Sequence, residues 1–297
     1  MTLPVLVNRA GGAAAAAGER LQPDIEAAFE KAGTRAQVRL LSGGEIAAAV
    51  REAAGRCERI AVAGGDGSLS CAAGALADLP DASALAILPL GTLNHLARDL
   101  GIPADLAEAA ALAAHGSPRA IDVGRVNDHV FVNNASIGLY PLMVRNRDAA
   151  RERHGLPKWL ATLPAAWTAL RRLPHHRLRL HIAGRERAVV TPLLFVGNND
   201  YSLDAGTLGR RESLEDGRLS VFAVGRQTRR GLIWFAARTL AGRVDRHEDF
   251  ETLGNLTTMD VRGHGSDVRI AIDGEVMHLA FPLAFSVAPK ALRVIAP

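Results

Sequence analysis

A glycine-rich segment directly after an apolar run carries the sharpest chemical signal in the sequence. Residues 59–70 read Arg-Ile-Ala-Val-Ala-Gly-Gly-Asp-Gly-Ser-Leu-Ser, which predicts a strand, a turn at Gly64, Gly65 and Gly67, and then a helix. Glycines at such a turn let the backbone approach a ligand closely, and the unpaired amides at the start of a helix bind anions. The segment therefore predicts a phosphate-binding turn, although a tight turn without a ligand would use the same glycines.

Asp66 lies inside this turn and limits the kind of ligand that the turn can bind. A carboxylate among phosphate-binding amides is electrostatically unfavourable unless Mg²⁺ or a substrate hydroxyl meets it. No Gly-Lys-Ser/Thr follows the turn, so it is not a P-loop, and its glycine spacing is not that of a dinucleotide fingerprint. Asp66 therefore favours a phosphate site with a cation or a hydroxyl acceptor over a turn without a ligand.

A second segment of strand, glycine turn and helix follows at residues 87–103. Because Asn is a preferred residue at helix starts, we expect Asn94 to cap this helix, and Gly101 with Pro103 to end it. Thr92 and Asn94 are then expected to face a ligand at the end of the strand. Ligands of open α/β sheets bind beyond the carboxyl ends of the strands, so the two turns predict one binding site.

Asp273, Gly274 and Glu275 form a third candidate, for which the residues alone favour a structural interpretation. An Asp-Gly pair between two β-like runs is a common hairpin turn. Two carboxylates two residues apart also suit phosphoryl transfer, where one deprotonates or orients the acceptor hydroxyl and the other binds metal or orients the first. Both interpretations stay open at this point.

The elements that must position these residues change in character near residue 120. Before it, short apolar runs alternate with alanine-rich helical stretches, which is typical of βαβ units with a parallel sheet. After it, short β-like runs broken by Gly, Asn and Asp predict an antiparallel sheet or sandwich. The expected strands are residues 3–7, 37–41, 59–63, 84–88, 121–126, 130–133, 178–182, 189–196, 219–224, 268–272 and 285–288, and the expected helices are residues 19–32, 45–54, 68–77 and 106–114.

The predicted fold class is therefore α/β, with two domains. A Rossmann-like βαβ nucleotide-binding domain is expected over residues 1–120, completed by a segment near residues 285–297. A β-rich, sandwich-like acceptor-binding domain with helical inserts is expected over residues 121–284. The inserts, residues 156–173 and 226–244, carry apolar residues at helical spacing with arginines beside them. Each insert is either packed in the core or an interfacial or lid helix over an apolar substrate.

Composition and charge limit the kind of protein and of binding partner that the sequence can represent. Apolar residues make up 48% of the chain and charged residues 22%, which is typical of a folded globular protein and excludes a disordered one. The formal net charge of +4 suits phosphates or an anionic membrane surface and does not imply nucleic acid. No run reaches the about 18 apolar residues of a membrane span, and no signal peptide is visible. We expect a cytoplasmic protein that contacts a bilayer only peripherally, at the inner face of the membrane.

The two glycine turns together resemble the paired nucleotide-binding motifs of the diacylglycerol kinase catalytic-domain family. Within it, the chain is most similar to bacterial lipid kinases related to diacylglycerol and sphingosine kinases. Further segments resemble motifs of this family in the same order along the chain, namely residues 8–12, residues 131–138 (Phe-Val-Asn-Asn-Ala-Ser-Ile-Gly), residues 214–219 (Leu-Glu-Asp-Gly-Arg-Leu), residues 271–275 (Ala-Ile-Asp-Gly-Glu) and residues 289–297. The resemblance covers almost the whole chain.

The resemblance implies an ATP-dependent lipid kinase that transfers the γ-phosphoryl group of ATP to a lipid hydroxyl. It implies nucleotide contacts from ten residues of the first half: Asn8, Gly11, Gly12, Gly64, Gly65, Asp66, Gly67, Ser68, Thr92 and Asn94. It also implies Mg²⁺ held by the Asp216 side chain and by the backbone carbonyls of Ser213 and Arg218. Glu275 would be the catalytic proton acceptor, with Asp273 beside it.

The same resemblance implies ATP and a lipid acceptor as partners, and self-association into a homodimer stays open. Contact with an anionic membrane surface is expected from the two basic helical inserts, whose apolar stripes offer Trp159, Trp167 and Trp234 as interfacial anchors. Two alternatives remain. An NAD kinase-like small-molecule kinase is one, since that related family also uses Gly-Gly-Asp-Gly. A catalytically weak lipid- or nucleotide-binding regulator is the other, to which His95 points, because family members often have Asp at this position.

Overall fold

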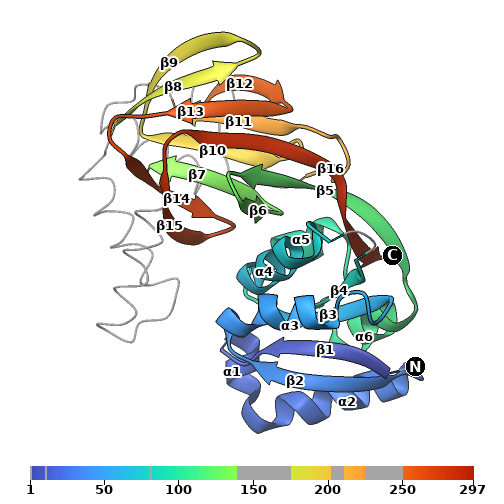
Figure 1. The fold of residues 1–297 in the computed structure, drawn as a ribbon. Helices are drawn as coiled ribbons and strands as arrows, with labels where there is room; N and C mark the ends of the chain where they lie inside the picture. Colours follow the sequence, from blue (N-terminus) through green and yellow to red (C-terminus); the bar gives the residue numbers. More distant parts are fainter. Residues whose placement is uncertain (1, 11, 80–81, 139–174, 202–210, 225–249) are drawn as a thin grey trace. The chain divides into compact units, whose positions relative to one another are not determined.

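The computed structural model describes residues 2–10, 12–79, 82–138, 175–201, 211–224 and 250–297 (Figure 1). The chain divides into two compact units, each described by itself below. Unit 1 comprises Met1–Val123, His129–Asn133 and Ala288–Pro297, and unit 2 comprises Gly124–Asp128 and Asn134–Val287. The predicted helical inserts, residues 156–173 and 226–244, lie outside the described residues.

Unit 1 is built on a parallel sheet whose central strands are mostly apolar. Neighbouring strands lie in the order β2 (Arg35–Leu41), β1 (Thr2–Asn8), β3 (Arg59–Gly64), β4 (Ala84–Pro89), and the C-terminal part of β16 (Leu283–Ala296) pairs with β4. β3 and β4 are almost wholly buried, as expected for strands covered on both faces. The predicted βαβ pattern of the first half is confirmed.

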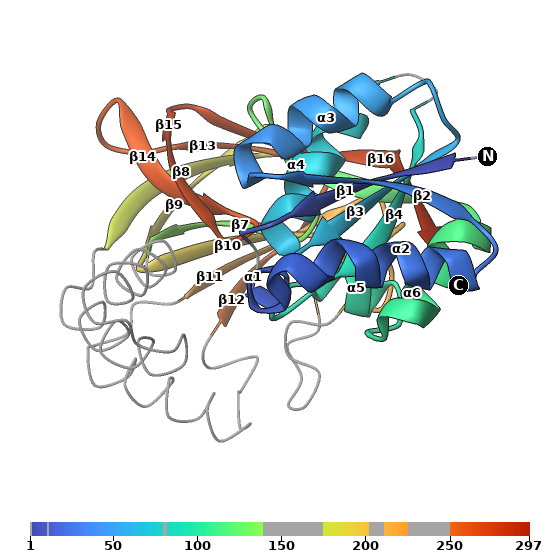
Figure 2. The same ribbon diagram turned by 90° about the horizontal axis from the view of Figure 1, so that it is seen from below.

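Helices cover both faces of this sheet (Figure 2). They are α1 (Gly12–Ala17), α2 (Leu21–Lys31), α3 (Ile46–Ala53), α4 (Asp66–Leu76), α5 (His95–Asp99) and α6 (Leu106–His115). α2 packs on α6, and α3 packs on α4 on the other face. In α2 the buried residues Leu21, Ile25 and Phe29 recur every four positions, so the helix turns one apolar stripe toward the sheet. Strand β5 (Ser117–Val126) and the short β6 (His129–Phe131) follow α6.

Unit 2 consists of antiparallel strands in two groups, which confirms the predicted β-rich, sandwich-like second half. One is a six-stranded sheet in the order β12 (Phe250–Leu256), β11 (Leu219–Val224), β10 (Leu193–Asn198), β7 (Asn134–Gly138), β14 (Asp267–Ile272), β15 (Glu275–Ala280). The other pairs β9 (Arg185–Thr191), β8 (His176–Ile182) and β13 (Thr258–Arg262) with the N-terminal part of β16. No helix in the described part of the chain is long and apolar enough to cross a membrane.

One predicted strand is wrong in an instructive way. The run 189–196 was expected to form a single strand, but it breaks at Pro192 into β9 and β10, which pair with different strands. Proline has no N–H to donate to a β ladder, so the ladder stops there. At the break, the Thr191 hydroxyl bonds to neighbouring backbone groups. Its oxygen accepts the N–H of Leu193 at 3.1 Å and lies 2.8 Å from the carbonyl oxygen of Val224.

Candidate active site

The carboxyl end of β1 is tied to the first turn of α4 by a contact between two predicted site residues. Asn8 Nδ2 donates to Ser68 Oγ at 2.8 Å, and Asn8 Oδ1 accepts the N–H of Ala10 at 3.1 Å. Ser68 is buried, so this bond fixes the Asn8 amide on a rigid helix. Gly12, another predicted site residue, begins α1, and Gly11 lies outside the described residues.

The two glycine turns lie directly against each other. Leu90 N–H donates to the carbonyl oxygen of Gly64 at 3.0 Å, so the backbones of the two turns are hydrogen-bonded. A Cβ on Gly65 would lie 3.1 Å from the Cα of Gly91, and a Cβ on Gly91 would overlap the Cα of Gly65. A Cβ on Gly64 would lie 2.7 Å from Ser68 Oγ. These glycines are therefore required by close approach of backbone to backbone or side chain.

Asp66 joins the first turn to the start of α5. Its Oδ1 accepts the backbone N–H of His95 at 2.7 Å, across 29 positions of sequence. The expectation that only Mg²⁺ or a substrate hydroxyl could meet this carboxylate is wrong in that respect, because a backbone amide already meets one oxygen. The half-buried carboxylate is thereby held in a fixed direction beside Gly67, at the first turn of α4.

Asn94 does not cap α5 as predicted. The residue adopts the left-handed conformation, with φ 48°, and its side chain makes no capping hydrogen bond. Instead its Oδ1 accepts the N–H of Gly91 at 2.9 Å, and its Nδ2 donates to the carbonyl oxygens of Gly91 at 3.0 Å and Pro89 at 3.3 Å. The Asn94 amide therefore shapes its own turn, while Thr92 on that turn is exposed.

The loop after β2 adds a third segment at this edge of the sheet. The backbone N–H and the hydroxyl of Ser42 donate to Glu45 Oε2 at 2.8 and 2.7 Å, which closes a capping box at the start of a helical turn. These two hydrogen bonds lower the pKa of the exposed Glu45 carboxyl group. A Cβ on Gly43 would lie 3.5 Å from Asn8 Nδ2, which places this loop beside the end of β1.

In unit 2, Asp273 and Gly274 form the two-residue turn between β14 and β15. Their φ angles are 45° and 88°, and Ile272 pairs with Glu275, so the hairpin interpretation of these residues is confirmed. Asp273 is only 8% exposed, and it exchanges two hydrogen bonds with β7. Its Oδ1 accepts the N–H of Asn134 at 3.0 Å, and its own N–H donates to the Asn134 carbonyl at 2.9 Å. Glu275, by contrast, is exposed.

The predicted metal residues lie on one loop that a buried asparagine holds in place. Asn199 is fully buried with φ 65°, and its Oδ1 accepts the N–H of Asp216 at 3.1 Å. Its N–H donates to the Arg218 carbonyl at 2.9 Å, and its carbonyl accepts the Ser220 hydroxyl at 2.8 Å. Asn199 was not predicted from the sequence. Its only signal is that asparagine, which tolerates the left-handed conformation, follows a strand, and its partners lie 17 to 21 positions away.

The donor set on this loop fits a hard cation. Asp216 is partly exposed and offers a carboxylate, while Ser213 and Arg218 offer carbonyl oxygens. Mg²⁺ takes oxygen ligands and often uses only one or two carboxylates, with water and substrate phosphates completing its shell. The Arg218 carbonyl already accepts one hydrogen bond, but a carbonyl oxygen has a second lone pair. Among the described residues, no group of three or more His, Cys, Asp or Glu side chains could hold a metal.

Two protein-family models match the chain, one in each half. Residues 2–126 match the model of the diacylglycerol kinase catalytic domain, and residues 143–296 match the YegS C-terminal NAD kinase beta sandwich-like domain. A diacylglycerol kinase of Bacillus subtilis is 39% identical over 113 residues, which is 37% of this chain and 37% of that protein. A probable lipid kinase YegS-like of Chromohalobacter salexigens is 32% identical over 187 residues, 61% of this chain and 59% of that protein.

Solved structures share the fold over the full length. The crystal structure of a diacylglycerol kinase from Bacillus anthracis covers 100% of this chain and 97% of its own, with a TM-score of 0.68 at 19% identity. At this identity the likeness concerns the fold alone. The two curated relatives are matched over only 37% and 59% of their own lengths.

Proposed function

Because the chain belongs to the diacylglycerol kinase catalytic-domain family, we propose that it is a lipid kinase that transfers the γ-phosphoryl group of ATP to a lipid hydroxyl. The observation that carries the proposal is the direct backbone contact between the turns at Gly65 and Gly91, with Asp66 tied to His95. Such packed glycine turns at strand ends bring backbone amides close to a phosphate chain without side chains in the way.

In this proposal unit 1 binds ATP through its strand-end loops. The backbone of Gly64, Gly65 and Gly67 approaches the phosphates, and Ser68 and Asn8, bonded to each other, line the same turn. The exposed Thr92 offers a hydroxyl from the second turn. The contribution of Asn94 is to hold that turn, since its amide is already bonded to Gly91 and Pro89.

Mg²⁺ would be held by the Asp216 carboxylate and by the carbonyls of Ser213 and Arg218, and it would supply positive charge for phosphate groups. The chain's own part is to keep this loop rigid through Asn199. Asp216→Asn should weaken Mn²⁺ binding, followed by electron paramagnetic resonance, by more than about tenfold, because even partners of metal ligands contribute that much. Glu215→Gln is the matched control, since it removes a neighbouring exposed carboxylate and should leave Mn²⁺ affinity unchanged.

Unit 2 would supply the proton acceptor. Glu275 is exposed at the start of β15, so its carboxylate can take the proton of an acceptor hydroxyl as that oxygen bonds to the γ-phosphorus and the bond from the γ-phosphorus to ADP breaks. Asp273 is locked to Asn134 on β7 and sets the shape of the hairpin that presents Glu275. We assign proton acceptance to Glu275 and positioning to Asp273.

A lipid acceptor requires the enzyme to meet a membrane surface, and the net charge of +4 suits contact with anionic lipids. We propose peripheral contact of this kind. Binding to anionic vesicles should then weaken as salt screens the attraction, while neutral vesicles should bind less. Equal binding to both kinds of vesicle would contradict this part of the proposal.

An NAD kinase-like small-molecule kinase is the second candidate, favoured by the description of the matched C-terminal domain as NAD kinase beta sandwich-like. The deciding experiment supplies ATP labelled at the γ-phosphate, Mg²⁺ and a panel of acceptors to the purified chain. The panel holds diacylglycerol, other lipid alcohols in mixed micelles, and NAD. We expect label in an organic-soluble product. Label in NAD alone would establish the second candidate, and ATP binding without transfer to any acceptor would favour a regulator.

A further inference from the structure

His95, the first residue of α5, is bonded to neighbouring groups of unit 1 through both its backbone and its ring. Its backbone N–H donates to Asp66 Oδ1 at 2.7 Å, and its ring Nδ1 lies 2.9 Å from a guanidinium nitrogen of Arg98. Asp66 belongs to the first glycine turn, and His95 directly follows the second. His95 therefore lies where the two turns meet.

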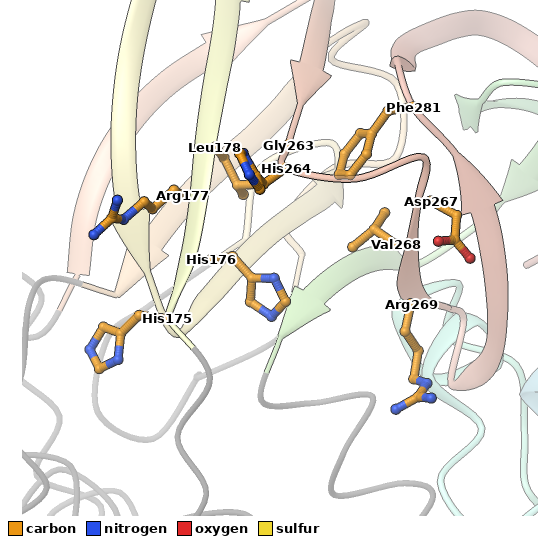
Figure 3. A pocket seen from close by; sticks show the side chains of 10 residues that line it. All are labelled: His175, His176, Arg177, Leu178, Gly263, His264, Asp267, Val268, Arg269 and Phe281. Atoms are coloured by element: carbon orange, nitrogen blue, oxygen red, sulfur yellow. The ribbon is translucent and has the colours of Figure 1, made fainter.

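Three histidines of unit 2 show what such bonds add. His175, His176 and His264 line one hollow, but no described residue forms a hydrogen bond with their rings. Arg269, in the same lining, extends away from His176 and His264 (Figure 3). These basic groups do not converge on one ligand position, so the hollow offers no defined donor. The ring of His95, by contrast, is held by a specific partner.

That partner determines which nitrogen of the His95 ring carries the proton. A guanidinium has only N–H donors, so Nδ1 of His95 must accept from Arg98 and carries no proton. The ring proton is then on Nε2, because the bond made by one ring nitrogen sets the state of the other. Among the described residues, the rings of His115 and His278 also form hydrogen bonds, but their partners are oxygen acceptors. His95 is thus fixed as an Nε2–H donor.

The Nε2–H group of His95 has no acceptor among the described residues. Leu96, Ala97 and Leu100 are buried, so this stretch turns its apolar side toward the core. His95 and Arg98 are three positions apart and lie together on the other side. The half-buried ring is therefore held beside the glycine turns with one donor left for a ligand.

We propose that His95 donates from Nε2 to a phosphate oxygen of the bound nucleotide, and that Arg98 is the residue that positions this donor. The inference rests on the proposed binding of ATP by unit 1. A hydrogen bond to an ionised phosphate oxygen is stronger than one between two neutral groups. An ionised Asp, which family members often have at this position, has no proton to donate and would need a cation between itself and the phosphate. This chain would contact the phosphate directly.

Titration calorimetry with ATP in EDTA, without Mg²⁺, measures this contact. Every variant at His95 keeps the backbone N–H that binds Asp66, so the start of α5 should stay in place. His95→Ala should weaken ATP binding by about tenfold or more, since a hydrogen bond to a charged group contributes that much. His95→Gln should stay within about threefold of the wild-type affinity, because its amide N–H can replace Nε2–H.

His115→Gln is the matched control. The His115 ring also makes one hydrogen bond, to the carbonyl oxygen of Ala32, but it lies at the end of α6. Arg59, the first residue of β3, donates to the carbonyl oxygens of Ala114 and Gly116. This end of α6 therefore lies beside the start of β3, whereas the first glycine turn follows the end of β3. ATP affinity should stay unchanged in this variant.

His95→Asp separates a phosphate contact from a contact with the base or the ribose. In EDTA the carboxylate should repel the phosphates, so this variant should bind ATP more weakly than His95→Ala does. Mg²⁺ should recover much of that difference, because the cation can bridge the carboxylate and the phosphate. Equal ATP affinity of the two variants in EDTA would contradict the phosphate contact.

Nitrogen–proton correlation spectra of the histidine rings test the part of Arg98. Arg98→Lys keeps both the charge and a donor, so His95 should keep its proton on Nε2. Arg98→Met removes both, so part of the His95 population should carry the proton on Nδ1, and ATP should bind more weakly. A loss of ATP affinity without a change of tautomer would mean that Arg98 acts through its charge alone, and its positioning role would be wrong.

The calorimetry also separates this inference from the proposed function. If the wild-type chain binds ATP and His95→Ala binds it equally well, the inference is wrong and the proposed function stands. If His95→Gln loses as much affinity as His95→Ala, the ring does not act as a hydrogen-bond donor. If the wild-type chain binds no ATP, with or without Mg²⁺, the proposed function fails and this inference fails with it.

Discussion

In unit 1, two polar side chains of the candidate site, Asp66 and Asn94, are bonded to the chain's own backbone. Asp66 accepts the N–H of His95, and Asn94 uses both ends of its amide within its turn. In unit 2, Asp273 is held in the same way by Asn134, but Glu275, two residues later, is exposed. Unit 1 therefore offers a ligand a fixed backbone shape with one tethered carboxylate, and unit 2 offers an exposed one. Unit 1 should be sensitive to added atoms, and unit 2 to removed charge.

The largest effect is expected at the exposed carboxylate. Glu275→Gln keeps the size of the side chain and removes its basicity, so turnover should fall by on the order of a hundred- to ten-thousandfold. ATP affinity should stay nearly unchanged, since the proposal assigns Glu275 to the acceptor hydroxyl and not to the nucleotide. Steady-state kinetics and a separate nucleotide-binding titration measure the two quantities.

Asp273→Asn is the companion variant. Asparagine tolerates the left-handed conformation that Asp273 adopts and can still accept the Asn134 N–H, so the hairpin should keep its shape. If this variant lost turnover while Glu275→Gln kept it, the two roles would have to be exchanged. If neither lost turnover, the hairpin would be structural alone.

The next largest effect concerns the tethered carboxylate of unit 1. Asp66→Asn keeps an oxygen that can accept the His95 N–H, so the melting temperature should change little. Turnover should nevertheless fall by about ten- to a hundredfold. A hydrogen bond to a charged group contributes about 1.5–3 kcal/mol, which corresponds to a change of this size. Asp66→Ala, which also removes the acceptor, should lose stability as well. Full turnover in Asp66→Asn would mean that the carboxylate serves only to join the two turns.

The third effect in size should come from an added side-chain atom at a glycine turn. Gly91→Ala places a Cβ where the Cα of Gly65 lies, so the turns must move apart, and we expect ATP affinity to drop by about tenfold. Gly74→Ala is the matched control, because its Cβ would meet Val130 at an ordinary 3.7 Å. In the interior of α4 it should add about 0.5–1 kcal/mol of stability and leave ATP binding intact. A folded Gly91→Ala protein with normal ATP affinity would show that contact between the turns does not shape the site.

Local patterns made the turns of both units readable from sequence. Glycines after a buried strand and an Asp-Gly pair between β-like runs are signals contained within a few residues, and both turns lie where they were predicted. Their partners were not readable. His95 lies 29 positions from Asp66, and Asn134 lies 139 positions from Asp273, so only the folded chain brings them together.

Some strands, too, could be identified from the sequence and others could not. Buried strands such as β3 and β4 are continuous apolar runs that sequence alone identifies. The edge strand β15 was not predicted, because it buries little and its residues show no clear apolar alternation. The run 189–196 was predicted as one strand, but the missing proline N–H at Pro192 ended the ladder there.

The smallest effect should come from His176, a second polar group of unit 2 that bonds to no other described residue. Burial, with the help of His175, lowers its pKa in the folded chain, so the folded state binds a proton less readily than the unfolded state does. Stability from this group is therefore present above the ordinary pKa of 6.5 and is lost as the pH falls through the lower folded value. His176→Gln removes the titrating group, so the wild-type chain should lose stability relative to the variant as the pH falls, measured by urea unfolding. A wild-type chain that instead gained stability over His176→Gln in acid would mean that the protein supplies the imidazolium with a partner, and unit 2 would then resemble unit 1 in bonding its own polar groups.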